Sequence, residues 1–459
     1  MKKSPNVLFF GIDTLRRSRM SLYGYHRHTT PHLDLYAQSG AVWNQCFSAS
    51  IPTTSGYANL FTGHDCFGTG IVALGHKGDY APGIKTLPEI LRENGYDTTC
   101  VGFTGNPASR GFDKYLEFEG WGSWEQGRSH KAENLNAVAI PELRRLAAGE
   151  KPFCLFLRHM DPHSPYLAPQ PFERMFYSGN EFDPNNKSLD EPMSFRPFQD
   201  FFAAWFPPGC TDAEYINAQY DAEIAYMDAC IVALLEELRT LGLEDDTVIV
   251  FVSDHGETLD EHGCYYDHHG LYECTLEVPL VFRYPKKIPA GTRFDDVVTL
   301  PDVLPTLLDL LDIPWNSMGL TGRSLLPRMN GGALTPEPEF YITECTWMRK
   351  HGWRTPQYKL IRALEPDFHG KPSVELYDLI RDPGELHNIA GEEMGIVNLL
   401  TDRMNNWIVR RGQETARPAP MFTNFLRNDA PFKTTQEAYD GLHIGDPEAA
   451  KKLQQAKKK

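Results

Sequence analysis

The sequence predicts an α/β fold, in which helices cover both faces of a large mixed, mostly parallel β-sheet and a small antiparallel sheet follows. Two observations support this fold. Short apolar runs recur along the chain, as expected of strands buried on both faces of a sheet. Segments with helical spacing lie between these runs, and such alternation is typical of α/β proteins. The predicted strands of the large sheet are 6–12, 97–103, 153–159, 247–253 and 278–284.

Two of the intervening helices have recognisable signals. In the segment 86–95, Thr86 is a suitable N-cap and Gly95 marks the end. The segment 212–242 has the spacing of a long amphipathic helix. Because strands joined by helices run parallel, their carboxyl ends meet at one edge of the sheet. Ligands of such sheets bind at that edge.

A change of composition near residue 330 divides the predicted architecture. The segment RMNGGALTPEPEF (328–340) is rich in Gly and Pro, as in a linker. Shorter strand patterns follow at 358–364 and 374–380, which fits a small antiparallel sheet. We therefore expect a catalytic α/β domain over 1–330 and a smaller α+β subdomain with a tail over 331–459.

Composition narrows the class of protein. The 459 residues are 41% hydrophobic and 23% charged, which is typical of a soluble globular enzyme. The formal net charge of −16 argues against a nucleic-acid partner, because phosphate backbones are bound mainly by clustered Lys and Arg. The 9 cysteines lack CxxC spacing and fit a reducing compartment, and the first apolar run is too short for a signal sequence or a membrane span. We expect a cytoplasmic protein without a membrane partner.

Two segments stand apart from the predicted core. The insert 170–210 is aromatic and Pro-rich and contains FQDFFAAWFPPG. The segment RPAPMFTNFLRNDAPF lies near the end, at 417–432. Each is a candidate for covering a pocket or for meeting another subunit, and we expect a homo-oligomer.

Polar side chains follow two of the predicted strands. Asp13 comes directly after 6–12, and Asp254 with His255 comes after 247–253. At a shared sheet edge, two carboxylates and an imidazole make a divalent-metal site of mixed oxygen and nitrogen character. The alternative is that the two aspartates only cap turns or helices.

Several ordered motifs resemble those of the sulfatase branch of the alkaline phosphatase superfamily. The opening NVLFFGIDTLRRSRMSLYGYHRHTTPHLDLYAQSG (6–40) is similar to the family's first strand, metal Asp and following segment. FLRHMDPHSPYLAP (156–169), VSDHGETLDEHGCYYDHHGLYECTLEVPLVFR (252–283) and ELYDLIRDPGELHNIA (375–390) resemble later motifs in the same order. The resemblance extends to phosphonate monoester hydrolase-like, phosphodiesterase-like and arylsulfatase-like members. It implies an alkaline phosphatase-like α/β sandwich that hydrolyses small anionic sulfate or phosphorus esters.

The expected nucleophile is the point at which the sequence departs from the family. In that family it is a formylglycine made from Cys or Ser in C/S-x-P-x-R, and an LxTG sequence follows nine residues on. In SASIPTTSGYANLFTG (48–63), counting back from LFTG puts Thr53 at this position. Ser50, with Pro52 two residues later, is the alternative, but it requires three extra residues before LFTG and lacks the Arg of the motif. We expect an unmodified Thr53 to attack and no formylglycine.

The loss of formylglycine bears on the substrate. A formylglycine hydrate expels sulfate by collapsing to an aldehyde, whereas a threonine ester must be hydrolysed by attack on the transferred group. That chemistry is familiar for phosphoryl transfer with metals. It favours phosphate diesters or phosphonate monoesters, with promiscuous sulfate-ester hydrolysis. The alternatives are a true sulfatase, a phosphotransferase, or an inactive binding protein.

The resemblance also implies the metal ligands, which are Asp13, Asp254, His255 and Thr53. Thr14 stands where many sulfatases carry a second Asp, and His255 stands where calcium sulfatases often carry Asn. Both changes favour one Mn²⁺ ion, with Zn²⁺ or Ca²⁺ as alternatives.

Further residues match family positions around the substrate. His163 resembles the family's leaving-group histidine, a role that suits an imidazole with a pKa near neutrality. His268 falls where the family often has a substrate-binding Lys, and the adjacent His269 can take the same role. A second binding Lys has no match, and Thr104 and Asn106 are the nearest polar residues.

Overall fold

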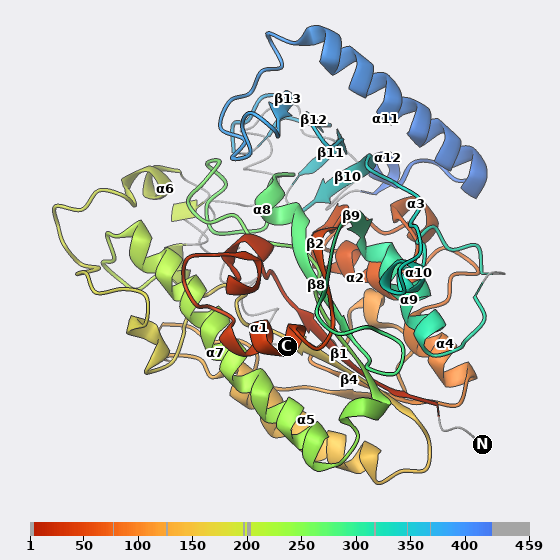
Figure 1. Ribbon diagram of the computed structural model, residues 1–459. Coiled ribbons are helices and arrows are strands. Elements are labelled where there is room, and N and C mark those ends of the chain that lie inside the picture. Colours follow the sequence, from red (N-terminus) through yellow and green to blue (C-terminus); the bar gives the residue numbers. More distant parts are fainter. Residues whose placement is uncertain are drawn as a thin grey trace.

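A computed structural model describes residues 4–424, except 77, 125–126, 196–197, 200–202, 316–317, 347 and 368. The predicted α/β fold is confirmed. A large mixed sheet lies between two layers of helices, and a second, smaller sheet lies beside it (Figure 1). Among the described residues, no helix combines the length and the apolar character needed to cross a membrane.

The large sheet has eight strands, of which only one is antiparallel to the rest. In their order across the sheet they are β5 (Lys114–Leu116), β4 (Asp97–Val101), β6 (Phe153–His159), β1 (Asn6–Ile12), β7 (Thr247–Ser253), the antiparallel β8 (Glu277–Arg283), β2 (Ala41–Phe47) and β9 (Thr292–Thr299).

The small sheet joins distant parts of the chain. Its four C-terminal strands are antiparallel, and a two-residue strand from the N-terminal part is added in parallel at its edge. In order they are β13 (Val374–Asp378), β12 (Tyr358–Ala363), β11 (Arg349–Arg354), β10 (Phe340–Cys345) and β3 (Ser50–Ile51). The sheet predicted at the C-terminus therefore also fixes the segment that leads into Thr53.

The helices vary from single turns to 28 residues. The α-helices are α1 (Pro31–Ala37), α2 (Thr53–Thr62), α3 (Cys66–Thr69), α4 (Leu87–Glu93), α5 (Lys131–Ala147), α6 (Asp190–Ser194), α7 (Ala213–Thr240), α8 (Glu273–Leu276), α9 (Val303–Leu310), α10 (Leu326–Met329), α11 (Met394–Thr415) and α12 (Pro420–Thr423). Short 3₁₀ helices are η1 (Arg17–Arg19), η2 (Ser21–Tyr23), η3 (Pro107–Ser109), η4 (Phe172–Arg174), η6 (Ala203–Trp205), η7 (Glu244–Asp246) and η8 (Leu300–Asp302).

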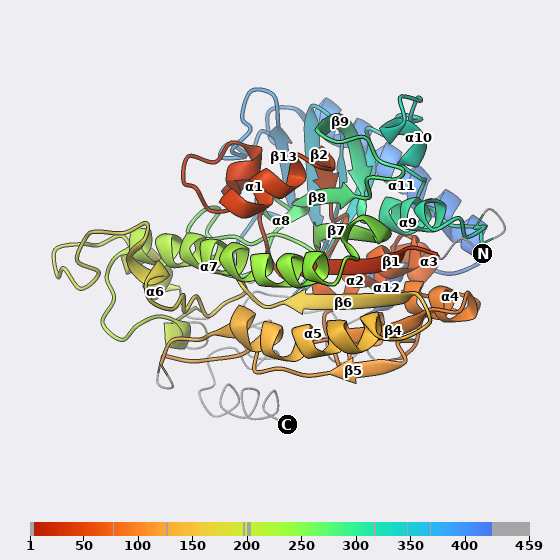
Figure 2. The same ribbon diagram turned by 60° about the horizontal axis from the view of Figure 1, so that its bottom comes forward.

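Alternation along β1 explains the two helical layers. Val7 and Phe9 point into one core with α2, α4 and α9, whereas Leu8 and Phe10 point into the other with α5 and α7. Figures 1 and 2 show these helix groups on opposite faces of the sheet. All seven residues of β1 are buried, as the apolar run that follows Asn6 predicts. The arrangement leaves the carboxyl ends of β1 and β7 as neighbours at one edge.

The helix signals read from the sequence hold in detail. Thr86 and Glu89 form a capping box at the start of α4, and Asp212 caps α7 by accepting a hydrogen bond from the Glu214 N–H. In the insert 170–210, residues 196–197 and 200–202 lie outside the described part of the chain. So does much of the candidate tail segment, from residue 425 onward.

Candidate active site

Thr53 is the first residue of α2 and lies at the edge where β7 ends. Its side chain is buried, and its Oγ1 lies 3.1 Å from Nε2 of His255. Pro52 takes the N-cap position, so Thr53 does not serve as the cap. The close approach depends on Gly56, because a Cβ there would meet the Asp254 carbonyl oxygen at 2.6 Å. Glycine therefore allows α2 to deliver the hydroxyl to the carboxyl end of β7.

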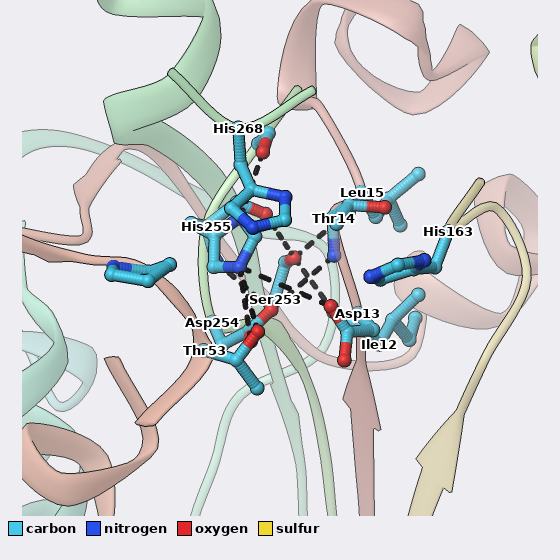
Figure 3. A network of polar contacts seen from close by, with 12 residues as sticks. Ile12, Asp13, Thr14, Leu15, Thr53, His163, Ser253, Asp254, His255 and His268 are labelled. Carbon is cyan, nitrogen blue, oxygen red and sulfur yellow. Dashed lines mark hydrogen bonds and ion pairs between the residues drawn. The ribbon is translucent and has the colours of Figure 1, made fainter. Parts of the chain in front are cut away.

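Two carboxylates and an imidazole meet beside this hydroxyl (Figure 3). Asp13 and Asp254 follow Ile12 and Ser253, which are paired across β1 and β7. Nε2 of His255 lies 3.4 Å from Asp254 Oδ2 and 3.9 Å from Asp13 Oδ1. The ligand atoms of Asp13, Asp254 and His255 all lie within 4.8 Å of one another. The structure thus brings together the four residues expected to bind the metal, Asp13, Asp254, His255 and Thr53.

The hydrogen bonds of these side chains leave one oxygen of each carboxylate without a partner. Asp254 Oδ1 accepts the N–H groups of Thr14 and His255, while its Oδ2 is buried without a hydrogen-bond partner. Asp13 Oδ1 is buried and equally without a partner. His255 directs Nδ1 toward the Gly256 carbonyl at 2.8 Å, so Nε2 faces the cluster. Buried, unpaired oxygens beside an imidazole nitrogen fit a divalent cation.

The electrostatics of the cluster agree with this fit. Burial opposes ionisation of Asp13, but Arg158 and nearby imidazoles outweigh it and lower its pKa to about 2. Burial and the charge of Asp13 raise the pKa of Asp254 well above its usual range. Burial also lowers the pKa of His255 to about 3. One carboxylate is thus charged, and the proton held by the other can be displaced by a cation.

Arg158 is a site residue that the sequence analysis missed. It is the only charged residue in the run FCLFLRH, and its Nε donates to Asp13 Oδ2 at 2.8 Å. Its Nη2 contacts the same oxygen. A charged side chain near the end of an otherwise apolar strand is the feature of the sequence that could have identified it.

His163 lies on the opposite side of Asp13 from Thr53 (Figure 3). Burial lowers its pKa to about 4, and its Nδ1 lies 2.7 Å from the Ser164 carbonyl oxygen. Buried Lys131 supports this loop, since its Nζ donates to the His163 carbonyl at 2.8 Å. The half-exposed ring of Trp121 stands edge-on to His163, with centroids 5.1 Å apart, and marks the solvent side of the site.

The adjacent histidines His268 and His269 have different surroundings in the structure. The His268 ring lies 4.8 Å from that of His255 and 5.9 Å from that of His163, between centroids. His269 instead directs Nδ1 to His369 Nε2 at 2.7 Å. Burial opposes protonation of His268, but Asp267 raises its pKa to about 9.

The remaining candidates lie farther out. Asn106 donates through Nδ2 to Thr54 Oγ1 at 3.1 Å, so it contacts the neighbour of Thr53. Thr104 is exposed at the surface. Ser50 is buried within β3, opposite Thr343 of β10. Thr53, and not Ser50, is the hydroxyl beside the carboxylates.

Comparisons with known proteins agree with this geometry. The Sulfatase family model matches residues 5–313, and the model for the N-sulphoglucosamine sulphohydrolase C-terminal region matches residues 260–410. The chain is 25% identical to N-acetylglucosamine-6-O-sulfatase of Bacteroides thetaiotaomicron, over 85% of this chain and 83% of the relative. It is 26% identical to choline-sulfatase of Rhizobium meliloti, over 86% of this chain and 84% of that relative.

Solved structures show the same fold. Phosphonate monoester hydrolase of Agrobacterium radiobacter superposes with a TM-score of 0.72 at 22% identity, covering 89% of this chain and 96% of that one. The phosphonate monoester hydrolase of Silicibacter pomeroyi gives a TM-score of 0.67 at 19% identity, and the match covers 90% of this chain and 96% of that one. The family match spans more than half of the chain and includes the residues of the cluster. The chain therefore belongs to the sulfatase family of hydrolases.

Proposed function

We propose that the protein hydrolyses phosphate diesters or phosphonate monoesters through a covalent ester on Thr53. The observation that carries this proposal is the position of the Thr53 hydroxyl, 3.1 Å from His255 Nε2 at the N-terminus of α2. A threonine does not supply the formylglycine that lets a sulfatase release sulfate without attack on sulfur. Its ester with phosphorus is instead open to attack by water.

The chain's own residues prepare the attack. His255 donates from Nδ1 to the Gly256 carbonyl, so the lone pair of its Nε2 faces the Thr53 hydroxyl. A cation bound to that lone pair would also contact the hydroxyl oxygen, and the hydroxyl proton would then pass to solvent. The helix N-terminus and the buried site favour the alkoxide. Asp13, Asp254, His255 and Thr53 would hold a divalent cation, which would supply Lewis acidity to the alkoxide and to the charge on the ester oxygens.

The reaction then runs in two steps. Thr53 Oγ1 forms a bond to phosphorus while the bond to the leaving alcohol breaks, and the departing oxygen takes a proton from His163. The His163 ring is neutral in the free protein, and a bound anion next to it favours the protonated form. Water next attacks phosphorus and gives a proton to His163, which is neutral after the first step, while the bond to Thr53 breaks and Oγ1 takes a proton from solvent. The imidazolium of His268 steadies the anion in both steps.

Sulfate-ester hydrolysis is the second candidate, because the similar curated proteins are themselves sulfatases. The two candidates differ in reactivity toward matched substrates. We would measure kcat/KM for nitrophenyl esters of a phosphate diester, a phenylphosphonate, a phosphate monoester and sulfate, using Mn²⁺-loaded protein. Preference for the diester or the phosphonate supports the proposal. Preference for sulfate contradicts it.

Two matched variants decide which hydroxyl is used. Thr53→Ala removes the hydroxyl beside His255, and Ser50→Ala removes the one in β3. We expect only Thr53→Ala to abolish hydrolysis of the preferred ester. Loss of activity in Ser50→Ala, with Thr53→Ala active, would assign the chemistry to Ser50.

A further inference from the structure

Trp121 is a large aromatic side chain beside the site that the proposed mechanism does not use. It is 49% exposed, and its ring stands edge-on to the His163 ring, with 5.1 Å between centroids and 79° between planes. It thus lies between solvent and the imidazole that protonates the leaving alcohol in the proposed mechanism. Contact with a ligand accounts for a large exposed ring at this position better than core packing does.

Two glycines hold the segment of Trp121 against the loop that follows β6. A Cβ on Gly120 would lie 3.0 Å from Met160 Cγ. A Cβ on Gly122 would lie 3.2 Å from Leu167 Cδ1. A larger residue at either position would push the segment away from this loop, which carries the leaving-group histidine. The chain on both sides of Trp121 is therefore closely packed, while the indole itself stays half-exposed.

Hydrogen bonds fix the chain on both sides of Trp121. Before it, the Glu119 carbonyl accepts from Asn134 Nδ2 at 3.0 Å. After it, the Ser129 N–H donates to the Leu167 carbonyl at 3.2 Å. The backbone of Trp121 is thus anchored both to α5 and to the loop that follows β6. A contact that is held in place before the ligand arrives costs less ordering entropy on binding than a mobile one.

The expected path of the leaving group runs toward Trp121. Thr53 and His163 lie on opposite sides of Asp13 (Figure 3). In an in-line displacement, the attacking and leaving oxygens occupy opposite sides of phosphorus. An oxygen expelled opposite Thr53 therefore lies on the side of His163, and its substituent extends toward solvent. There it meets the exposed ring of Trp121.

We propose that Trp121 binds the leaving alcohol and that this alcohol carries a planar aromatic ring, as a phenol does. The inference rests on the proposed function for the in-line arrangement, and it concerns the alcohol of the ester rather than the anion. A planar ring packs against the indole in an offset or edge-to-face arrangement, which adds attraction beyond the area that it buries. An aliphatic alcohol of the same size gains only the burial of area.

Binding of the free alcohols tests this contact without turnover. Phenol and cyclohexanol, which are similar in size, are titrated into the Mn²⁺-loaded protein and followed by ligand-observed NMR. We expect phenol to bind about 2–10-fold more tightly than cyclohexanol to the wild type, and this difference to vanish in Trp121→Ala. Phe182→Ala, which removes an equally exposed ring from the insert 170–210, is the matched control and keeps the difference. Equal binding of both alcohols by the wild type would overturn the proposal.

Selectivity in turnover gives a second measurement. Two esters of the same acid are compared, one of a substituted phenol and one of a fluorinated aliphatic alcohol with a matched pKa. In Trp121→Ala we expect the aryl-to-aliphatic ratio of kcat/KM to fall about 2–10-fold, mainly through the KM of the aryl ester, and in Trp121→Phe to recover. If Trp121 only supported His163, kcat would fall for both esters at an unchanged ratio, and this result would overturn the proposal.

The acid of these esters separates the inference from the proposed function. The ratio is measured on whichever of the phosphorus or sulfate esters the protein hydrolyses best, and thermal unfolding of each variant establishes that it is folded. Preference for sulfate, with a ratio that depends on Trp121, would contradict the proposed function and leave the alcohol site intact. Preference for the diester or the phosphonate, with a ratio that Trp121→Ala does not change, would do the reverse.

Discussion

Arg158 occupies one oxygen of the Asp13 carboxylate and leaves the other free. Its Nε donates to Oδ2 at 2.8 Å, while Oδ1 is buried, has no hydrogen-bond partner and lies 3.9 Å from His255 Nε2. The two oxygens of Asp254 differ in the same way, because Oδ1 accepts two backbone N–H groups and Oδ2 has no hydrogen-bond partner. In each carboxylate the protein therefore binds one oxygen and leaves the other available to a cation.

Replacing Arg158 by Gln should therefore weaken metal binding. Groups that orient metal ligands typically contribute about 10–100-fold in affinity, and we expect a loss of Mn²⁺ affinity in that range. Competition with a chromophoric chelator measures it. Arg144→Gln is the control, because Arg144 pairs with Glu237 at the surface. Equal affinity in wild type and Arg158→Gln would show that Asp13 needs no support from Arg158.

His163 should matter most for poor leaving groups. If it protonates the departing oxygen, His163→Ala lowers kcat/KM by about 10²–10⁴-fold for alkyl esters. It should change the rate far less for 4-nitrophenyl esters, whose leaving group needs no proton. A series of diesters with leaving alcohols of increasing pKa tests this. A uniform loss across the series would assign His163 to binding instead.

Lys131 should stabilise the loop that carries His163. Its buried Nζ lies 3.0 Å from Glu223 Oε1 and 3.4 Å from Asp161 Oδ1. Lys131→Met leaves these carboxylates buried without their cation, which typically costs about 3–5 kcal/mol. Urea unfolding measures the loss, and kcat should fall with it because the His163 carbonyl loses its donor.

The control for Lys131 is an exposed ion pair of the same type. Lys151 lies 3.3 Å from Asp97, and Lys151→Met should cost less than about 1 kcal/mol. In the double variant Lys131→Met/Glu223→Gln, part of the lost stability should return, since one uncompensated charge is removed. A Lys131→Met protein as stable as Lys151→Met would contradict the role of the buried network.

His159 should make the fold sensitive to acid. Its ring is 0% exposed, neither nitrogen has a hydrogen-bond partner, and burial lowers its pKa to about 3. The unfolded chain binds a proton on this ring near pH 6.5 and the folded chain does not. Stability is therefore complete above pH 6.5 and falls by up to about 1.4 kcal/mol per pH unit as the pH drops toward 3.

Urea unfolding in the presence of chelator checks this dependence. Between pH 7.5 and 5.5, the stability of the wild type relative to His159→Phe should fall by about 1.4 kcal/mol. Exposed His387 provides the control, and His387→Asn should follow the wild type. A constant difference between wild type and His159→Phe would mean that His159 is protonated equally in both states.

Much of the fold could be predicted because local patterns determine it. The run 6–12 is apolar at every position but its first, Asn6, and it forms a fully buried strand. The end of that strand places Asp13 where a parallel sheet collects its ligands, and β7 does the same for Asp254 and His255. Correct strand boundaries are therefore enough to identify these three residues in the sequence.

Residues that depend on tertiary contacts could not be assigned in this way. His268 and His269 are adjacent and chemically identical, and tertiary contacts such as that of His269 with His369 distinguish them. Lys131 is far from the loop of His163 in sequence, and the pairing arises only when α5 packs beside β6. Thr104 and Asn106 are close in sequence, yet only Asn106 reaches the neighbour of Thr53.

The most direct test of the account is to identify the covalently modified residue during turnover. A slowly hydrolysed nitrophenyl phosphonate is mixed with Mn²⁺-loaded protein, quenched in acid within the first turnover and digested for mass spectrometry. The account predicts an unmodified chain before reaction and a phosphonyl group on Thr53 after it. A phosphonyl group on Ser50, or a formylglycine at position 50, would contradict it.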